Sequence, residues 1–559
     1  MARSAGPGGT PGAAWHWKGE GALNLEIRVS RLDGPALVQD YYACAPALAP
    51  FFAGWPWDPE VYRRKAEEVD RRFDAGRRRR MAEAIRATTP AAAAKLERVA
   101  NGEGVFVTTG QQAGLFGGPL FTVYKILTAV RLAEALEPVL GRPVVPLFWV
   151  ASDDHDWEEV NHVHVVDGSN AVQRIAVEGE GEAEGVGSSM ARRRLGAGVE
   201  AALGRLADLM PQTSFAASYL ELLRRAYRPE RTVAQAFGDV IAELFAEFDL
   251  LVVDPAHPVV KELSAGVLAL ELERSAEHEA LLARQSSGLE AAGYHVQVGV
   301  LPGAANVFFE DEAGRERLVA EDGGWVLRRT RRRLETEELR ALLESEPGRF
   351  SPNVLLRPVV ESAVFPTVAY VAGPSELSYY AQVRCLFQAH GMEMPVVYPR
   401  ASVTLIEAKV RKVLDKFGLG VEDFRRPTHE VAARVLREEL PEDVVEALAW
   451  LRRVLGEGYG RLAEAAKKVD ATLGGPVIGA RNAAYVQLEE VEKKIAAHLK
   501  TRNAVGLEQL EKARTNLFPL GQPQERVLSV MPYLARYGPE LLQAIAGQLV
   551  VELEGGPRA

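Results

Sequence analysis

The sequence predicts an α/β protein with a parallel-sheet core and a long antiparallel helical hairpin near its C-terminus. Short apolar runs alternate with helical stretches through the first 400 residues. Each of these runs ends in Gly, Pro, Ser or Asp, which is typical of strands bounded by turns. Beyond residue 440 the apolar residues recur at steps of three and four, which is typical of a coiled coil.

Five runs are expected to form the main sheet. Their near-continuous apolarity is typical of strands covered on both faces. They span residues 104–110, 143–152, 248–255, 365–373 and 394–400. The stretch 121–136 between the first two is expected to be helical, because Val123, Ile126, Leu127, Val130 and Leu132 share a broad apolar face.

Two stretches interrupt this alternation. Residues 167–200 are rich in Gly, Glu and Arg and are expected to form a surface insertion. Residues 293–345 hold strand formers around turn signals, which predicts a small β-rich insertion. The predicted organisation is a flexible extension at 1–23, a core at 24–404 with insertions at about 167–235 and 290–350, a helical coiled-coil domain at 405–520, and a helical segment at 521–559 that returns to the core.

The predicted hairpin has two apolar stripes separated by GGPVIGA at 474–480, where a helix break is expected. The first stripe contains Val444, Leu448, Leu451, Leu455, Tyr459, Leu462, Ala466, Val469 and Leu473. The second contains Leu488, Val491, Ile495, Leu499, Leu507, Leu510 and Leu517. Because the stripes hold more apolar surface than one hairpin covers, we expect a homodimer through the coiled coil.

Composition restricts the class of function. The 66 Lys and Arg residues against 76 Asp and Glu give a net charge of −10, which argues against nucleic acid as a partner. The two cysteines, Cys44 and Cys385, cannot build a disulfide framework and fit a reducing compartment. No apolar stretch reaches the length of a membrane span, so a cytoplasmic location without membrane attachment is expected.

The first candidate site is the segment 108–125, which follows a predicted strand and opens a helix. Such a junction presents backbone N–H groups to an anion, and its glycines permit close approach. It matches neither G-x-G-x-x-G nor a Walker A loop, and a purely structural turn is the alternative. The predicted ligand-binding residues here are Gly110, Gln111, Gln112, Gly114, Gly118 and Lys125.

The second candidate site, residues 150–164, follows another predicted strand. Ligands of open α/β sheets gather at that edge. His155 beside Asp154 suits a general base with an aspartate that fixes its tautomer, and Asp153 and Asn161 are candidate binding residues. A solvated acidic turn that caps a helix is the alternative, and it accounts for Asp156, Glu159 and His164. The spacing of the ionisable residues in this segment matches no standard zinc motif.

The third candidate site lies at 355–383, with the end of the strand 394–400. Gly373, Ser375 and Glu376 open a helix whose N-terminus suits an anion, and Ser375 is expected to cap it. Tyr379 and Tyr380 could cover a bound ring, or could belong to the core. Arg357 and Arg400 are candidate clamps for carboxylate or phosphate, with ordinary ion pairs as the alternative.

Taken together and in order, several of these segments resemble the bacillithiol biosynthesis cysteine-adding enzyme family over about residues 24–545. The segments are TTGQQAGLFGGPLFTVYK, PLFWVASDDHDWEEVNHVHV, RPVVESAVFPTVAYVAGPSELSYYAQV, MPVVYPRASVTLIE and PQERVLSVMPYLARYGP. The resemblance implies a Rossmann-like core with connecting-peptide insertions and a coiled-coil domain. It also implies a ligase that adds L-cysteine to the amino group of glucosaminyl-malate in the last step of bacillithiol biosynthesis.

The resemblance extends distantly to class I aminoacyl-tRNA synthetases, which implies nucleotide-dependent activation of the cysteine carboxylate. ATP with Mg²⁺ is therefore the expected cosubstrate, although neither HIGH nor KMSKS occurs. No zinc site is evident, and no metal-binding residue is predicted. We expect His155 with Asp154 to act as the base, and Lys125, Arg357 and Arg400 to bind the malate carboxylates.

Two other functions fit the same residues. One is a transferase that acts on another small amine, because function resides in the site and not in the fold. The other is a non-catalytic assembly protein of the pathway that binds nucleotide or product. The ionisable residues clustered at two strand ends favour catalysis.

Overall fold

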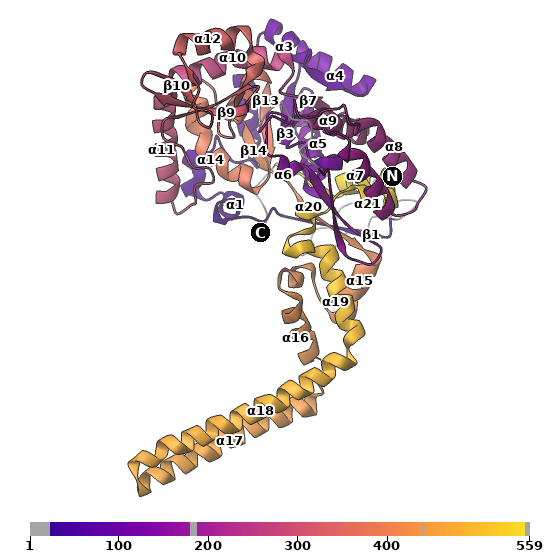
Figure 1. Ribbon diagram of the computed structural model, residues 1–559, viewed down its shortest axis with the longest axis vertical. Coiled ribbons are helices and arrows are strands. Elements are labelled where there is room, and N and C mark those ends of the chain that lie inside the picture. The colour runs from indigo at the N-terminus through magenta and orange to yellow at the C-terminus, as the bar shows by residue number, and fades with distance from the viewer. Residues whose placement is uncertain (1–22, 179–186, 439, 554–559) are drawn as a thin grey trace. The chain divides into compact units, whose positions relative to one another are not determined.

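The structure is a computed structural model that describes residues 23–178, 187–438 and 440–553 (Figure 1). The predicted extension up to residue 22 and residues 179–186 of the Gly- and Glu-rich insertion lie outside this range. The chain divides into two compact units. One contains residues 1–405 and 525–559, and the other contains residues 406–524.

The first unit is built on a six-stranded sheet with the order β14-β13-β3-β4-β7-β2. The strands are β2 (Ile85–Ala87), β3 (Val105–Gln111), β4 (Val144–Val150), β7 (Leu251–Val253), β13 (Thr367–Ala372) and β14 (Val396–Pro399). Five of them run parallel, and β2 pairs antiparallel with β7 at the edge. The five predicted strands are confirmed, and the short β2 was not predicted.

Both faces of this sheet are covered, as the apolar runs predicted. Leu147 and Trp149 of β4 contribute to one hydrophobic core. Phe148 and Val150 contribute to a second core on the opposite face. This alternation follows from the two-residue period of a strand. The sheet is thereby held between two apolar layers that fix the ends of its strands.

Helices supply the covering layers. α5 (Leu120–Leu140) connects β3 to β4 and packs against both. α9 (Val233–Leu244) packs against β4 and β7, and α2 (Pro59–Arg72) and α14 (Pro374–Ala389) pack against β13 and β14. Further helices of this unit are α1 (Ala36–Tyr42), α3 (Ala75–Ala82), α4 (Pro90–Ala100), α7 (Gly198–Leu209), α8 (Ala216–Ala226), α10 (Pro258–Glu273), α11 (Ser275–Ala291), α12 (Thr336–Ser345) and α13 (Arg357–Val364).

The β-rich insertion forms an antiparallel five-stranded sheet with the order β11-β10-β9-β8-β12. Its strands are β8 (Ala304–Asp311), β9 (Gly314–Glu321), β10 (Gly324–Leu327), β11 (Arg333–Leu334) and β12 (Phe350–Pro352). The turn between β8 and β9 ends at Gly314, whose φ of +105° is accessible to glycine. The predicted hairpins are therefore present. Further along the chain from β4, α6 (Trp157–Val160) precedes a separate hairpin of β5 (His162–Val166) and β6 (Val172–Ala176).

The second unit is helical, and its long hairpin consists of α17 (Glu442–Val469) and α18 (Gly474–Arg502) (Figure 1). The expected break at 474–480 is wrong by a few residues. The chain turns at 470–473, and Gly474 begins the second helix. Asp470 explains this position, because its side chain accepts a hydrogen bond from the Thr472 N–H and terminates α17.

The second predicted stripe belongs to two different helices. Leu488, Val491, Ile495 and Leu499 lie on α18, whereas Leu507, Leu510 and Leu517 lie on α19 (Ala504–Leu517). The last three join a small core with α15 (Ala408–Phe417) and α16 (Thr428–Glu438).

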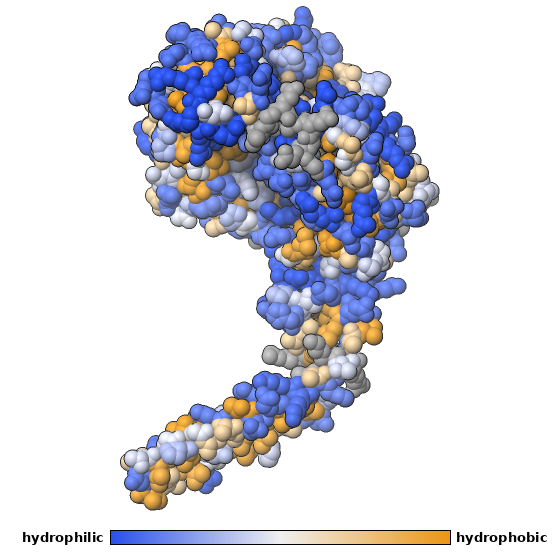
Figure 2. All heavy atoms as spheres, viewed as in Figure 1, coloured by the Kyte–Doolittle hydropathy of each residue, from blue (hydrophilic) through white to orange (hydrophobic). Residues whose placement is uncertain are grey.

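The hairpin leaves much of its apolar surface uncovered, and orange spheres occur along it in Figure 2. Its exposed apolar residues include Val445, Trp450, Leu451, Val454, Leu462, Val486 and Val491. The Trp450 side chain, for example, is 56% exposed. A pair of packed helices would bury such residues only against a further surface.

The segment after the second unit returns to the first one, as three short helices where one helical segment was predicted. These are α20 (Gln524–Val527), α21 (Met531–Tyr537) and α22 (Glu540–Gln548). β1 (Leu25–Ser30) and β15 (Ser402–Glu407) form a small two-stranded sheet. Among the described residues, no helix combines the length and the apolarity that a membrane crossing requires.

Candidate active site

A pocket of about 750 Å³ opens at the carboxyl ends of the parallel strands. Gly110 and Gln111 come from the end of β3, Asp153 and Asp154 follow β4, and Glu376 follows β13. The chain order reverses between β3 and β13, because β4 and β7 lie on one side of β3 and β13 and β14 lie on the other. Open α/β sheets bind their ligands in the crevice at such a switch point.

The opposite wall of the pocket comes from the antiparallel sheet. Phe308 lies on β8, Arg315 and Arg317 lie on β9, and Asn353 follows β12. The Arg315 guanidinium carbon lies 3.8 Å from the centre of the Phe308 ring, and that of Arg317 lies 5.1 Å from it. The aromatic face thus holds two cations side by side at the pocket wall.

Lys125 lies on α5 beneath the pocket, buried with its charge paired. Its Nζ lies 2.7 Å from a carboxylate oxygen of Glu376 and also donates to the backbone oxygen of Gly110. Burial lowers the pKa of Lys125, although Glu376 acts in the opposite direction. Burial acts to raise the pKa of Glu376, but the ammonium and donors from Tyr370 and Gly373 outweigh it, so that pKa is lowered. The two groups form a charged pair within the floor of the pocket.

Glu376 also organises the start of α14. Its carboxylate accepts a hydrogen bond of 2.6 Å from the N–H of Gly373, which is the N-cap residue. The expectation that Ser375 caps this helix is wrong, because no side chain caps it through the N-cap position and Glu376 closes back on the N-cap backbone. Ser375 lines the pocket in the first helical turn, where N–H groups have no intrahelical acceptor.

Arg357 begins α13 and is likewise committed to an internal carboxylate. It forms an ion pair with Glu361, one turn along the same helix, and donates to the Tyr379 hydroxyl at 3.1 Å. Its guanidinium also lies 5.0 Å from the centre of the Tyr370 ring. Thr108 on β3 donates to the other oxygen of Glu361. Arg357 therefore positions Tyr379 at the pocket wall.

Arg400, directly after β14, forms a bidentate ion pair with Glu525. The two nitrogen–oxygen distances are 3.0 and 2.7 Å, and both side chains are almost fully buried. Nε of Arg400 has no hydrogen-bond partner among the described residues. The fork geometry fixes the returning C-terminal segment to the sheet.

His155 faces Arg315, and this contact determines its tautomer. Its Nδ1 lies 3.1 Å from a terminal nitrogen of Arg315. A guanidinium can only donate, so Nδ1 accepts and the neutral ring carries its proton on Nε2. Burial lowers the pKa of His155 and the Arg315 cation lowers it further, against the opposing effect of Asp154. The ring is neutral at pH 7 and offers an N–H to a ligand.

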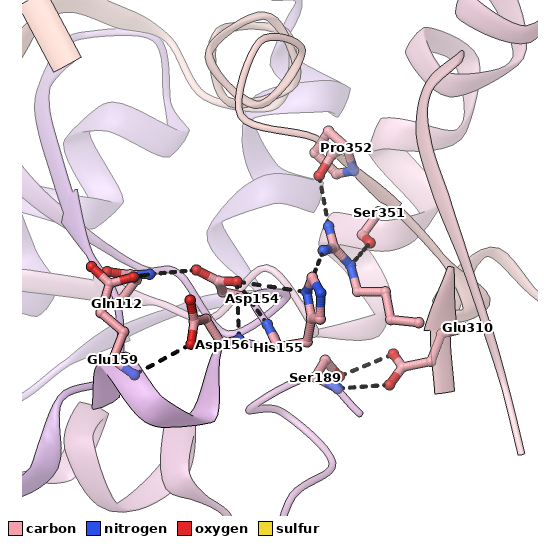
Figure 3. Close-up of polar contacts among 10 residues, drawn as sticks. Gln112, Asp154, His155, Asp156, Glu159, Ser189, Glu310, Ser351 and Pro352 are labelled. Carbon is pink, nitrogen blue, oxygen red and sulfur yellow. Dashed lines mark hydrogen bonds and ion pairs between the residues drawn. The ribbon is translucent and has the colours of Figure 1, made fainter. Parts of the chain in front are cut away.

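Asp154 lies at the centre of the polar contacts that Figure 3 shows. It accepts hydrogen bonds from the His155 N–H at 2.7 Å and from the side-chain nitrogen of Gln112 at 2.6 Å. Gln112 also donates to Glu159 at 2.8 Å (Figure 3). The nearest carboxylate oxygen of Asp154 lies 3.7 Å from Nδ1 of His155, which is too far for a hydrogen bond. Asp154 therefore does not fix the imidazole tautomer as expected. Asp154 is a carboxylate held by neutral donors at the pocket surface.

Neighbouring acidic residues have structural partners. Asp153 forms an ion pair of 2.7 Å with the buried Lys261. Asp156 caps α6 by accepting from the Glu159 N–H, as the solvated-turn alternative predicted. His164 lies opposite Arg174 in the register of the β5–β6 hairpin and does not line the pocket.

The pocket brings together most of the predicted site residues. Those that line it are Gly110, Gln111, Gln112, Lys125, Asp153, Asp154, His155, Arg357, Gly373, Ser375, Glu376, Tyr379 and Arg400. Tyr380 packs behind Tyr370 with ring centres 4.9 Å apart, as its core alternative predicted. Gly114, Gly118 and Asn161 do not line the pocket.

The prediction of a ligand-binding glycine loop fails at Gly114 and Gly118. The N–H of Gly118 donates to Leu115, and the carbonyl of Gly114 accepts from the Tyr227 hydroxyl. The first N–H of α5 donates to Leu528. The N–H groups of Gly114, Gly117 and Gly118 thus donate within the protein, as in a structural turn, and are not free for a phosphate.

Asn161 also has a structural role. Its N–H closes α6 on Trp157, its carbonyl accepts from Val177, and its side-chain oxygen contacts His162 and Arg174. These contacts hold the β5–β6 hairpin, away from the pocket lining.

Sequence reasoning missed one wall of the pocket. Arg315 donates to the Ser351 hydroxyl and to the Pro352 carbonyl, but it forms no ion pair within 4.0 Å with any described residue. The same holds for Arg317 and for Arg526, which follows Glu525 and is exposed at the pocket. The charged residues in GRERLVAE (314–321) alternate as in a solvated strand. No local pattern therefore marks Arg315 and Arg317 as pocket residues.

The fold and the pocket define a class of protein. A Rossmann-like sheet has a pocket at its switch point, walled by an antiparallel insertion, and a coiled coil follows in sequence. Family models for the "Bacillithiol biosynthesis BshC, N-terminal Rossmann-like domain" and the "Bacillithiol biosynthesis BshC, C-terminal coiled-coil domain" match residues 24–401 and 403–552. The chain therefore belongs to the BshC family of bacillithiol biosynthesis, which confirms the resemblance seen in its motifs.

Individual relatives agree along most of their length. A protein from Salinibacter ruber is 34% identical over 91% of this chain and 93% of its own. One from Koribacter versatilis is 31% identical over 91% and 94%, and one from Symbiobacterium thermophilum is 33% identical over 80% and 83%. Each of these relatives carries the name "Putative cysteine ligase BshC".

Proposed function

We propose that this protein is a cytoplasmic ligase that adds L-cysteine to the amino group of glucosaminyl-malate, the last step of bacillithiol biosynthesis. Family membership and the names of the relatives support the reaction class. The observation that carries the proposal in this chain is the distribution of charge in the pocket. Cations without carboxylate partners line it beside the open end of α14, which suits substrates that carry several carboxylates.

The malate carboxylates are assigned to Arg317 and Arg526. Neither side chain forms an ion pair with a described residue, and both line the pocket. Lys125, Arg357 and Arg400 are unsuited to this role, because each is already paired with a buried carboxylate. This assignment revises the one that the sequence predicted.

Amide formation requires an activated carboxylate, because a carboxylate anion resists attack by an amine. We propose ATP with Mg²⁺ as the source of that activation. The N-terminus of α14 at Ser375 and Glu376 is the part of the pocket suited to an anionic group. The turn from Gly114 to Gly118 is less suited, because the N–H groups of its three glycines donate within the protein.

His155 and Asp154 take different roles in this proposal from those expected. His155 offers its Nε2–H to an oxygen of the substrate that gains negative charge, because Nδ1 accepts from Arg315. Asp154 receives the proton of the attacking amine, since its neighbours are neutral donors and it faces the pocket.

The experiment is a mass-spectrometric assay of the full chain with glucosaminyl-malate, cysteine, ATP and Mg²⁺, with each component omitted in turn. A product of the mass of bacillithiol that disappears when ATP is omitted supports both the reaction and the activation. A product that persists without ATP contradicts nucleotide activation but leaves the proposed reaction in place.

The alternatives give other results in the same assay. A transferase for another amine yields no product here but accepts a related amino sugar. A non-catalytic assembly protein yields no product with any amine but binds nucleotide or bacillithiol in a calorimeter. Folded protein that neither reacts nor binds these molecules contradicts all three functions.

We also propose that two copies pair through the hairpin of α17 and α18. The exposed Trp450, Leu462 and Val486 support this arrangement. Replacing Trp450 and Leu462 together by Gln is expected to convert a dimer into a monomer in sedimentation experiments. A wild-type chain that is monomeric at micromolar concentration contradicts the dimer.

A further inference from the structure

Three ionisable side chains that the proposed reaction does not use converge within the first unit. They are Glu271 near the end of α10, His278 on α11 and His390 directly after α14. One potential metal-ligand atom from each lies within 4.8 Å of the others. None of the three lines the pocket, so the cluster is a separate feature of the fold.

The hydrogen bonds of Glu271 orient the first histidine. One carboxylate oxygen lies 2.5 Å from Nδ1 of His278. The other accepts from the backbone N–H of Asn306 at 3.0 Å and from its side-chain nitrogen at 2.8 Å. With a carboxylate at Nδ1, the neutral imidazole of His278 carries its proton there and has a lone pair on Nε2.

Nε2 of His278 is buried and has no hydrogen-bond partner among the described residues, and the same is true of Nε2 of His390. The His278 side chain is fully buried, so solvent does not satisfy this nitrogen. The two rings lie with their centres 5.0 Å apart. A buried polar atom without a partner is unfavourable, and two such nitrogens on neighbouring rings call for a common partner.

We propose that Glu271, His278 and His390 form a binding site for a divalent transition-metal ion, of which Zn²⁺ fits best. The ligands are Nε2 of His278 and Nε2 of His390, with Glu271 as the carboxylate that orients His278. This carboxylate–histidine–metal arrangement is the usual one for histidine ligands. Imidazole nitrogen favours zinc, nickel and copper over Mg²⁺, so the site is distinct from any Mg²⁺ that accompanies ATP.

The geometry requires only a small adjustment. Zinc–nitrogen bonds of about 2.1 Å place two tetrahedral ligands about 3.4 Å apart. One potential ligand atom of each of the three residues lies within 4.8 Å of the others, and rotation of the half-buried His390 would bring its Nε2 toward that of His278. His390 borders solvent, so water completes the coordination from that side.

Hydrogen bonds connect this cluster to the pocket. Asn306 donates to Glu271 and accepts from the Asn353 side chain at 2.7 Å. Asn353 lines the pocket and accepts the Leu355 and Leu356 N–H groups at the start of α13. A metal ion that fixes His278 and Glu271 therefore stabilises the insertion wall of the pocket without touching substrate.

The test compares the full-length protein with His390→Gln after removal of metal by a chelator. Zinc binding is measured by competition with a chromophoric chelator, and Co²⁺ is added separately for its visible spectrum. The wild type is expected to bind one ion per chain, and His390→Gln is expected to weaken binding by about 100-fold or more. His429→Gln, which changes an exposed histidine of the second unit, is the matched control and should bind like the wild type.

Two further measurements separate a ligand role from a folding role. Zinc should raise the melting temperature of the wild type and of His429→Gln, but not that of His390→Gln. Anomalous scattering from crystals of the zinc-loaded wild type should place a peak between His278 and His390, whatever the fate of the variant.

The proposal is overturned by any of three results. These are a wild type that binds no zinc at micromolar concentration, a His390→Gln variant that binds like the wild type, or an anomalous peak elsewhere. The first result would indicate that the two imidazoles share a proton in place of a metal ion.

Discussion

The two walls of the pocket differ in whether their cationic side chains are paired with carboxylates. On the Rossmann-like side the buried cations are each paired with a carboxylate, and the pairs are Lys125 with Glu376, Arg357 with Glu361, and Arg400 with Glu525. The exposed Arg526, next to Glu525, forms no ion pair with a described residue. On the insertion side Arg315 and Arg317 stack on Phe308 and form no ion pair with a described residue. The first set builds the floor. Of the second set, Arg315 is held by the Ser351 hydroxyl, the Pro352 carbonyl and His155, and Arg317 is the one we expect a ligand to contact.

This difference shows why position alone does not identify a binding residue. A buried cation without a partner is costly, so the cations nearest the sheet are paired as a condition of folding. On the insertion, the buried Arg315 is held by uncharged acceptors, whereas Arg317 is partly exposed in the pocket, where an anionic substrate would supply the missing charge. Breaking a pair on the first wall should therefore affect stability, whereas removing a cation from the second should affect binding.

The largest effect is expected from Glu525→Gln, which leaves Arg400 buried without its carboxylate. Loss of one partner from a buried pair costs about 3–5 kcal/mol of unfolding free energy. Urea denaturation measures this change. Glu103→Gln breaks an ion pair whose side chains are both more than half exposed and should cost less than about 1 kcal/mol. Equal losses in the two variants would contradict the distinction between buried and exposed pairs.

A smaller effect, on binding and not on stability, is expected from Arg317→Gln. Loss of a hydrogen bond to a charged group costs about 1.5–3 kcal/mol, which corresponds to a rise in KM for glucosaminyl-malate of about 10–100-fold. Arg328→Gln, an exposed position that does not line the pocket, is the matched control. An unchanged KM, or an equal change in the control, would remove Arg317 from the substrate site.

A still smaller effect is expected from Arg526→Gln. Arg526 lines the pocket but is exposed to solvent, so its contact with a carboxylate is screened and contributes about 0.2–1 kcal/mol. The KM for glucosaminyl-malate should rise by no more than about fivefold, and this rise should diminish at high salt. A loss as large as that of Arg317→Gln would mean that the two arginines contribute equally.

The sheet side of the molecule could be predicted because its physics is local. Strands such as β4 are covered on both faces and therefore consist of continuous apolar residues. The carboxyl ends of parallel strands meet at one edge, so Gly110, Asp154 and Gly373 could be placed together from sequence alone. β2 escaped prediction, because three residues with one arginine carry no strand signal.

The insertion side could not be predicted in the same way. Arg315 and Arg317 alternate along β9 like residues of a solvated strand, and only tertiary packing turns them toward the sheet edge. The protonation of His155 was equally hidden, because the residue that fixes its tautomer is 160 positions away. Pairing partners of Lys125 and Arg400 also come from distant segments, so their availability could not be judged.

The smallest effect concerns the titration of His155, which tests whether Arg315 controls it. Burial and the Arg315 cation lower the folded-state pKa of His155 below 6.5, so the unfolded chain binds the proton more readily. This contribution to stability is complete above pH 6.5 and is lost as the pH falls through the window below it. In His155→Gln the free energy of unfolding should fall less between pH 7 and pH 5 than it does in the wild type. In Arg315→Gln the pKa of His155, followed by its NMR signal, should rise toward 6.5. A midpoint that stays fixed in Arg315→Gln would mean that burial alone sets the protonation of His155, and that the insertion wall does not control the charge at the centre of the pocket.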